Sequence, residues 1–142
     1  MKLKLTPILM VCLAVLTTTT AYAAEYSDIA GHPDEPFIQE YSEQGLVNGY
    51  PDGTFLPNSP ITRAEVTALV NRLDLPAVNQ KTAYFSDVPA HEWYYDIIRN
   101  TVKTGLVSGY EDNTFQPQKN ITRFEAISIV SRLIEGEGAD RV

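Results

Sequence analysis

The sequence predicts an all-α fold, in which two copies of one helix–loop–helix unit pack as a small helical bundle. Gly45–Leu73 and Gly105–Leu133 align at a constant offset of 60 without a gap, and 16 of their 29 positions are identical. Each copy contains Ile-Thr-Arg-x-Glu followed by apolar residues at helical spacing. Such a repeat is one supersecondary unit that needs a neighbour to bury its core.

Residues 1–23 have the features of a secretory signal peptide. Lys2 and Lys4 precede an apolar run over residues 5–16, and Ala21-Tyr22-Ala23 is a small-x-small cleavage site. The apolar run is too short to span a bilayer comfortably. We expect cleavage after Ala23, export to the cell envelope and no transmembrane anchor on the mature chain; a retained anchor is the alternative.

The composition of the mature chain, residues 24–142, restricts its class. Its 142 − 23 = 119 residues suit one compact domain, and it lacks cysteine because Cys12 lies in the signal segment. Without Lys2 and Lys4 it has 11 − 2 = 9 basic and 18 acidic residues, a net charge of −9. This charge excludes nucleic acid as a partner. An acidic ligand would need a local cationic site.

The first helix of each unit is expected over Pro36–Gln44 and Glu92–Thr104. Pro36 suits the first turn of a helix, where its missing amide is not needed. Gly45 and Gly105 follow as left-handed C-terminal stops. Both helices therefore end at the same position of the repeat.

A compact loop is expected next, over residues 49–55 and 109–115. Pro-Asp-Gly is a turn signal in the first loop, and Asn113 can adopt the positive φ of Gly53. Asp52 and Asp112 are expected to cap their own turns through bonds to the backbone.

The second helix of each unit begins with a capping box, formed by Thr62 with Glu65 and by Thr122 with Glu125. One helical face is then apolar: Val66, Leu69, Val70 and Leu73 in the first copy, Ala126, Ile129, Val130 and Leu133 in the second. We assign motif 1 to about residues 26–75, a linker to 76–83, motif 2 to about 84–135 and a polar tail to 136–142.

Two segments, about Tyr26–Leu75 and Tyr84–Glu135, resemble the S-layer homology (SLH) motif in the order and spacing of their residues. The resemblance rests on Phe85-Ser86-Asp87-Val88, His91-Glu92-Trp93-Tyr94, Gly105-Leu106-Val107-Ser108-Gly109-Tyr110, Asp112, Thr114-Phe115-x-Pro117 and Ile121-Thr122-Arg123-x-Glu125. It implies an exported, non-catalytic module that binds secondary cell-wall polysaccharide, often capped by a pyruvylated sugar, or a peptidoglycan-linked polymer. Family anchors usually place three motifs about a pseudo-threefold axis with ligand grooves between them; this sequence has two.

Arg63 and Arg123 are the first candidate ligand-binding residues. Each lies just inside a helix start, where free amides and the helix dipole favour an anion. A guanidinium also matches a carboxylate with two parallel hydrogen bonds. The alternative is an intramolecular ion pair, for instance with Asp52 or Asp112.

The Gly-Tyr pairs of the loops, Gly49-Tyr50 and Gly109-Tyr110, are further candidates for glycan contact. Glycine exposes the backbone, and a tyrosine ring stacks on a sugar. Packing within the loop is the alternative. Trp93 could line a sugar groove or belong to the core. Glu65 and Glu125 are expected to act as helix caps rather than ligand contacts.

The sequence contains no pattern typical of catalysis or of a metal site. No nucleophile–base arrangement is present, and His32 and His91 lack the spacing of zinc ligands. We therefore expect no enzyme activity, cofactor or metal. Two function classes remain: a module that binds wall glycan, and a structural protein that forms a homo-oligomer or completes the SLH bundle of a partner chain.

Overall fold

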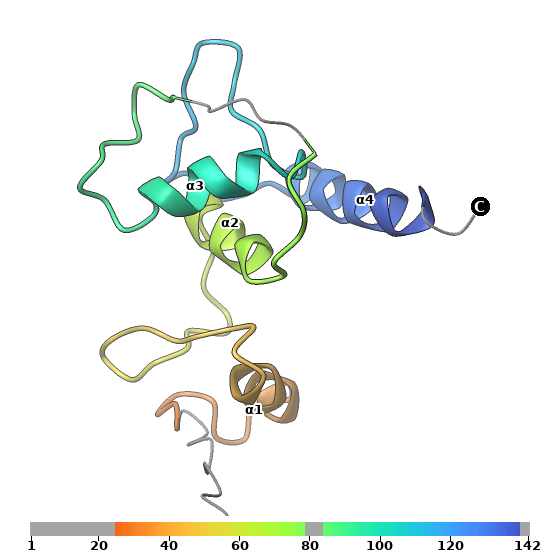
Figure 1. Cartoon of the computed structure of the whole chain (residues 1–142). Coiled ribbons are helices and arrows are strands. Elements are labelled where there is room, and N and C mark those ends of the chain that lie inside the picture. Colours follow the sequence, from red (N-terminus) through yellow and green to blue (C-terminus); the bar gives the residue numbers. More distant parts are fainter. Residues whose placement is uncertain (1–24, 79–83, 140–142) are drawn as a thin grey trace, which may run out of the picture.

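The structure, a computed structural model, describes residues 25–78 and 84–139. These residues form four helices and no strand: α1 (Glu35–Glu43), α2 (Arg63–Asn71), α3 (Tyr95–Val102) and α4 (Arg123–Ala139) (Figure 1). The all-α prediction is therefore confirmed. None of the helices in the described ranges is long and apolar enough to cross a membrane. The expected signal peptide and residues 79–83 of the expected linker lie outside the described residues.

Helices α1 and α3 end at Glu43 and Val102, shortly before the expected Gln44 and Thr104. Gly45 and Gly105 follow them with φ values of 71° and 76°, which glycine adopts without strain. Helix α3 begins at Tyr95, later than the expected Glu92, because Tyr95 N bonds to Glu92 O in a preceding turn at 3.1 Å. Trp93 therefore precedes the helix.

Helices α2 and α4 both start with a capping box. Thr62 Oγ1 accepts a bond from Glu65 N at 3.3 Å, and Thr62 N donates to Glu65 Oε2 at 2.7 Å. Thr122 and Glu125 make the same two bonds at 3.2 and 2.9 Å. Helix α4 continues to Ala139, into the segment expected as a polar tail.

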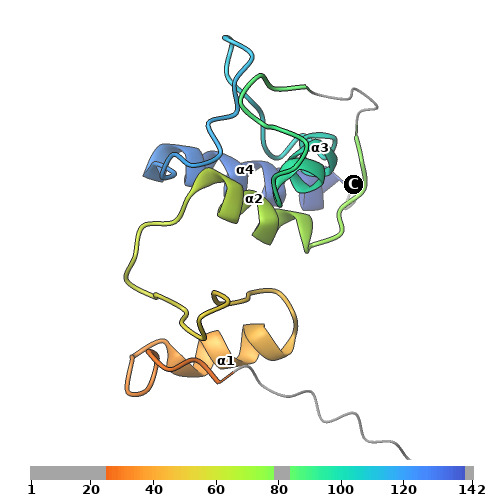
Figure 2. The same ribbon diagram turned by 90° about the vertical axis from the view of Figure 1, so that its left-hand side faces the viewer.

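The two motifs interlock through α2. A small core of Tyr26, Ile29 and Ile38 belongs to motif 1 alone. The larger core combines residues of motif 2 with Ala64, which belongs to α2 of motif 1. Helix α2 thus leaves α1 and packs on α3, the one helix pair in contact within the described ranges (Figures 1 and 2).

Backbone bonds fix the start of α2 on motif 2. Arg63 N and Ala64 N donate to Lys119 O and Pro117 O, each at 2.9 Å. These amides belong to the first turn of the helix and have no acceptor within it. Ile121 N also donates to Ile61 O at 3.1 Å. Motif 2 therefore caps the helix that motif 1 provides.

Candidate functional site between the motifs

The loops of the two motifs have the same backbone conformation. Tyr50 N donates to Thr54 O at 2.7 Å, and Tyr110 N donates to Thr114 O at 2.8 Å. Asn113 has a φ of 62°, and the equivalent Gly53 has a φ of 82°. The expected positive φ of Asn113 is confirmed.

Asp52 and Asp112 lie inside these loops. The Oδ1 atom of Asp52 accepts from Thr54 N at 3.0 Å and from Thr54 Oγ1 at 2.7 Å. Asp112 makes the same two bonds with Thr114. These bonds lower the pKa of both aspartates, the hydroxyl bond most strongly. Both carboxylates therefore bond to their own turns, and neither pairs with Arg63.

The loop glycines fill positions with no space for a side chain. A Cβ atom on Gly109 would overlap the ring of Phe85 and lie 2.7 Å from Thr114 O. On Gly49 it would overlap the Tyr26 ring and Thr54 O. Packing alone thus requires glycine at both positions.

Asp28 and Asp87 hold the far ends of the loops, a role that we did not infer from the sequence. The carboxylate of Asp87 accepts from Phe115 N at 2.8 Å and from Gln116 N at 2.7 Å. Asp28 makes the same pair of bonds with the amides of residues 55 and 56. Their place in the Ser-Asp pair that begins each motif was the available signal.

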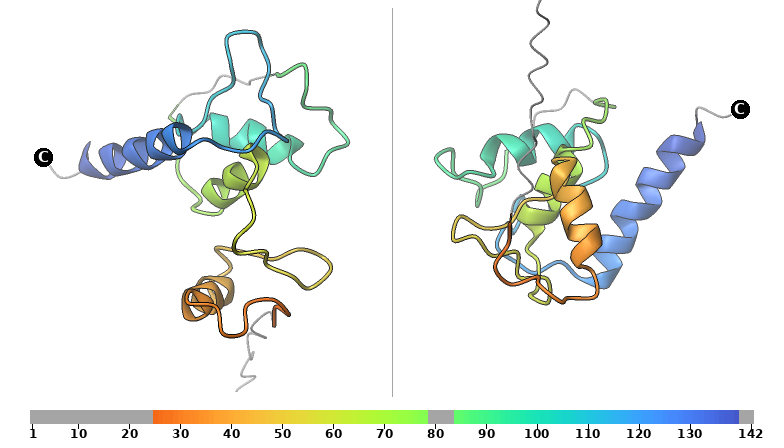
Figure 3. Two further views of the ribbon diagram at one scale, coloured as in Figure 1. Left: turned by 180° about the vertical axis from the view of Figure 1, so that it is seen from behind. Right: turned by 90° about the horizontal axis from the view of Figure 1, so that it is seen from below.

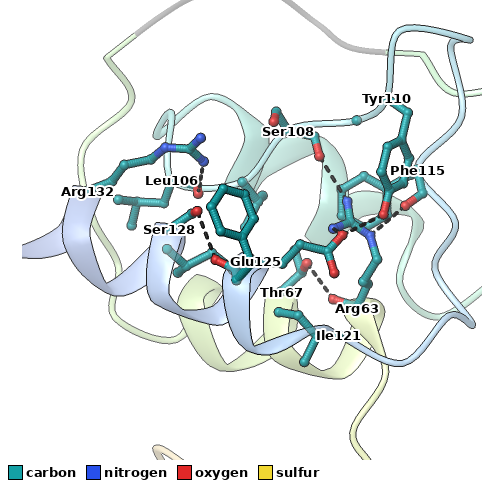
Figure 4. A pocket seen from close by; sticks show the side chains of 14 residues that line it. Arg63, Thr67, Leu106, Ser108, Tyr110, Phe115, Ile121, Glu125, Ser128 and Arg132 are labelled. Atoms are coloured by element: carbon teal, nitrogen blue, oxygen red, sulfur yellow. Dashed lines mark hydrogen bonds and ion pairs between the residues drawn. The ribbon is translucent and has the colours of Figure 1, made fainter.

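Arg63 lies at the centre of the junction between the motifs. Only 8% of its surface is exposed. Its Nε donates to Phe115 O at 2.9 Å, its Nη2 to Ser108 O at 3.0 Å and its Nη1 to Glu125 Oε1 at 3.0 Å (Figure 4). All three acceptors belong to motif 2. The intramolecular ion pair considered above is therefore present, but its partner is Glu125.

Two aromatic rings enclose the same guanidinium. Its carbon lies 4.7 Å from the ring centroids of both Tyr110 and Phe115, within cation–π range. Tyr110 also donates its hydroxyl to Glu125 Oε1 at 2.6 Å. Since a guanidinium has five N–H groups and three donate to motif 2, Arg63 retains two further donors.

A cavity of about 190 Å³ opens beside Arg63, and we call it the inter-motif groove. Motif 2 provides most of its lining, including Ser108, Gly109, Tyr110, Phe124, Glu125, Ser128 and Arg132. Arg132 donates to Leu106 O at 3.0 Å (Figure 4). Lys119 reaches the Tyr110 hydroxyl at 3.2 Å. Three cations, Arg63, Arg132 and Lys119, and one carboxylate, Glu125, therefore lie in or beside the groove.

Motif 1 has an equivalent cavity of about 690 Å³, and we call it the motif 1 groove. Its lining includes Gly49, Tyr50, Glu65 and Arg72, together with Trp93 from motif 2, which is 57% exposed. Trp93 is therefore a surface residue rather than a core residue. Among the described residues that line it, no arginine occupies the place that Arg63 has in the inter-motif groove.

Arg123 is not brought together with the other candidates. It is exposed and lines neither groove. Within the described parts of the chain, its side chain forms no hydrogen bond or ion pair. The two arginines at equivalent helix starts thus have opposite environments.

A comparison with protein families decides the classification. The family model of the S-layer homology domain matches residues 25–67 and 84–127. The chain belongs to the S-layer homology domain family. The two matched segments correspond to motifs 1 and 2, so the family resemblance of the sequence is confirmed.

Several proteins with similar sequences are named as surface or anchoring proteins. A cellulosome-anchoring protein of Acetivibrio thermocellus is 37% identical over 69% of this chain and 23% of its own length. Cell surface glycoprotein 1 of the same organism is 35% identical over 80% of this chain and 5% of its own length. A surface-layer 125 kDa protein of Lysinibacillus sphaericus is 35% identical over 87% of this chain and 10% of its own length. The chain thus spans less than a quarter of these relatives. No solved structure matches it.

These findings identify the SLH chain as a cell-surface attachment module, which is a non-catalytic class of domain. Within the described residues, no three His, Cys, Asp or Glu side chains are grouped so that they could hold a metal ion.

Arg72 and Arg132 are groove residues that sequence reasoning missed. Both are arginine at the same position of the repeat, near the end of the aligned segment. Each donates Nη1 to the carbonyl of the equivalent leucine, at 3.1 and 3.0 Å. Their identity in both copies was the available signal, but a late helix position does not itself indicate an anion site.

Glu125 gives the junction a dependence on pH. Burial raises its pKa, but the bonds from Tyr110 and Thr122 and the charge of Arg63 outweigh this, lowering it from 4.5 to about 2. Because the folded-state pKa is the lower one, the ionised carboxylate stabilises the fold above pH 4.5, and this stabilisation is lost as the pH falls towards 2.

We therefore expect the free energy of unfolding to fall with acidification through this range, and to fall less steeply in Glu125→Gln. Urea unfolding measured at several pH values tests this. Parallel pH profiles for the wild type and the variant would show that Glu125 is not responsible.

Proposed function

We propose that this SLH chain attaches to the bacterial envelope by binding an acidic wall glycan in the inter-motif groove. The observation that carries the proposal is the position of Arg63, which lines the groove between the motifs and retains two N–H donors. A carboxylate can accept two parallel bonds from such a guanidinium.

The charge around the groove favours an anion. Three positive charges, from Arg63, Arg132 and Lys119, lie in or beside the groove, against one negative charge from Glu125. The mature chain as a whole carries −9, so bulk attraction to an acidic polymer is excluded and the attraction must be local. A glycan with a carboxylate, such as a pyruvylated sugar, matches this arrangement.

Neutral groups of the groove suit the rest of a sugar. Ser108, Gly109 and Ser128 are among its lining residues. The Ser128 hydroxyl donates to Phe124 O at 2.9 Å and can still accept a hydrogen bond. Tyr110 provides a ring beside the guanidinium. Secondary cell-wall polysaccharide and peptidoglycan-linked polymers both present such sugars, and either is a suitable partner.

We assign the motif 1 groove a weaker role in a single chain. Its one arginine, Arg72, is balanced by Glu65, so it lacks the excess positive charge of the inter-motif groove. Tyr50 and Trp93 offer aromatic surface for sugar there.

The proposed cellular location follows from the expected signal peptide. Cleavage of residues 1–23 would export residues 24–142 to the wall, cell surface or periplasmic envelope.

Co-sedimentation with purified cell-wall sacculi tests the proposal. Residues 24–142 should pellet with intact sacculi, lose most of that binding on sacculi stripped of their acidic polysaccharide, and bind at least tenfold more weakly as Arg132→Ala. Equal retention on intact and stripped sacculi would contradict the proposal.

A further inference from the structure

Helix α4 repeats α2 in sequence but lacks the contacts that α2 makes. On α2, a face formed by Ala64, Thr67 and Val70 is buried, and the helix packs on α3. The equivalent residues of α4 are more apolar, yet they are exposed: Phe124 by 79%, Ile127 by 67% and Val130 by 53%. Figure 3 shows α4 extending from the rest of the molecule.

The start of α4 is also without the bonds that fix the start of α2. Arg63 N and Ala64 N bond to carbonyls of motif 2. Within the described ranges, Arg123 N and Phe124 N have no such acceptor, and the Arg123 side chain is unpaired. Helix α4 thus has a free arginine, free amides and an exposed apolar face.

Motif 1 contains an unfilled counterpart of the site that holds Arg63. We call it the motif 1 socket: the carbonyls of Asn48 and Phe55, the rings of Tyr50 and Phe55, and the carboxylate of Glu65. They are equivalent to Ser108 O, Phe115 O, the two rings that enclose Arg63, and Glu125. Within the described residues, neither of the two motif 1 carbonyls accepts a hydrogen bond.

The two sockets are built by the same bonds. Tyr50 donates to Glu65 at 2.7 Å, as Tyr110 does to Glu125 at 2.6 Å. Asp28 fixes the loop of motif 1 with bonds of 2.8 and 2.7 Å, the same lengths as those of its equivalent in motif 2. The motif 1 socket is therefore preformed.

Helix α1 provides the matching unpartnered surface. It contacts no other helix in the described parts of the chain. Tyr41 on α1 is 44% exposed, whereas the equivalent Thr101 on α3 is buried and bonds to Asn71 of α2 at 3.2 Å. The surface that α2 covers on motif 2 is thus open on motif 1.

We propose that two molecules of this chain associate head to tail: α4 of one packs on α1 of the other, and Arg123 enters the motif 1 socket. The occupant is a second molecule because the socket matches this arginine, whose positive charge complements Glu65. Residue sizes also compensate. Ala64 lies in one core cluster with Tyr94, whereas the larger Phe124 would meet the smaller Asp34 at the equivalent position.

This contact joins two different surfaces, so repeating it from molecule to molecule gives either an open filament or a closed ring. Two molecules that exchange their α4 helices use both pairs of surfaces, and this is the smallest closed form. The exchange would also add Arg123 to the motif 1 groove and give it an excess positive charge. That last consequence rests on the proposed glycan function; the association itself does not.

Sedimentation velocity of residues 24–142, with two variants, tests the association. Ile127→Asp alters only α4 and Tyr41→Asp only α1, and both residues are exposed, so circular dichroism should show unchanged helix content. We expect the wild type to associate as its concentration rises, and each variant alone to dissociate at a concentration at least tenfold higher.

Mixing the variants gives the decisive result. An Ile127→Asp chain retains its motif 1 socket and a Tyr41→Asp chain retains its α4, so an equal mixture should form a mixed dimer through one junction. Arg123→Glu should behave like Ile127→Asp.

A wild type that is monomeric at all concentrations would overturn the proposal. So would unchanged association of Tyr41→Asp, which indicates contact between two α4 helices. Loss of wall binding alone would bear on the glycan function only.

Discussion

Replacing Arg63 with alanine is expected to lower the free energy of unfolding by about 3 kcal/mol, because removing one partner of a buried ion pair leaves the other uncompensated. The change would leave Glu125 and the carbonyls of Phe115 and Ser108 without their bonds from the guanidinium. It would also remove the cation enclosed by two rings. Urea unfolding of residues 24–142, followed by circular dichroism, measures the loss.

Arg123→Ala is the matched control for this prediction. It makes the same change at the equivalent helix start, but Arg123 is exposed and has no partner in the described residues. At concentrations where the chain is monomeric, its unfolding free energy should stay within about 0.5 kcal/mol of the wild type. Equal losses in the two variants would mean that Arg63 does not hold the motifs together.

Replacing Gly109 with alanine is the second change with a large expected effect. The new Cβ atom would overlap the Phe85 ring and crowd Thr114 O, so the loop or the ring must move. Overpacking of this kind costs about 1–3 kcal/mol. We expect the upper end of that range for two reasons. Thr114 O is a backbone atom, and the Phe85 ring packs on the core residue Phe115, with 5.3 Å between the two ring centroids.

Thermal unfolding of Gly109→Ala beside Ser108→Ala measures this effect. Ser108 is exposed and contributes its carbonyl, not its hydroxyl, to the bond with Arg63. Its replacement should leave the midpoint nearly unchanged, whereas Gly109→Ala should lower it by several degrees. A Gly109→Ala protein as stable as Ser108→Ala would contradict the tight packing of the loop.

The local structure could be predicted because its causes are local. A Thr with Glu three residues later predicts a capping box, and glycine after an apolar run predicts a helix stop. Asn113 at the position of Gly53 predicts a positive φ, since asparagine tolerates it. Each inference needs only a few neighbouring residues and the repeat offset.

The junction could not be predicted, because it depends on residues far apart in the chain. Helical spacing shows that α2 has an apolar face, but not that this face packs on motif 2 rather than on α1. Arg63 and Glu125 are separated by 62 residues, and Asp87 and Phe115 by 28. The aspartates named in advance as partners for Arg63 were already bound to their own turns.

The two equivalent grooves allow the central claim, that acidic wall glycan binds in the inter-motif groove, to be tested directly. Calorimetric titration of monomeric residues 24–142 with a carboxylate-bearing wall-glycan fragment should show binding that Arg132→Ala weakens at least tenfold. The matched Arg72→Ala, in the motif 1 groove, should leave the affinity within twofold of the wild type. Equal weakening by both variants, or unchanged affinity in Arg132→Ala, would contradict the claim.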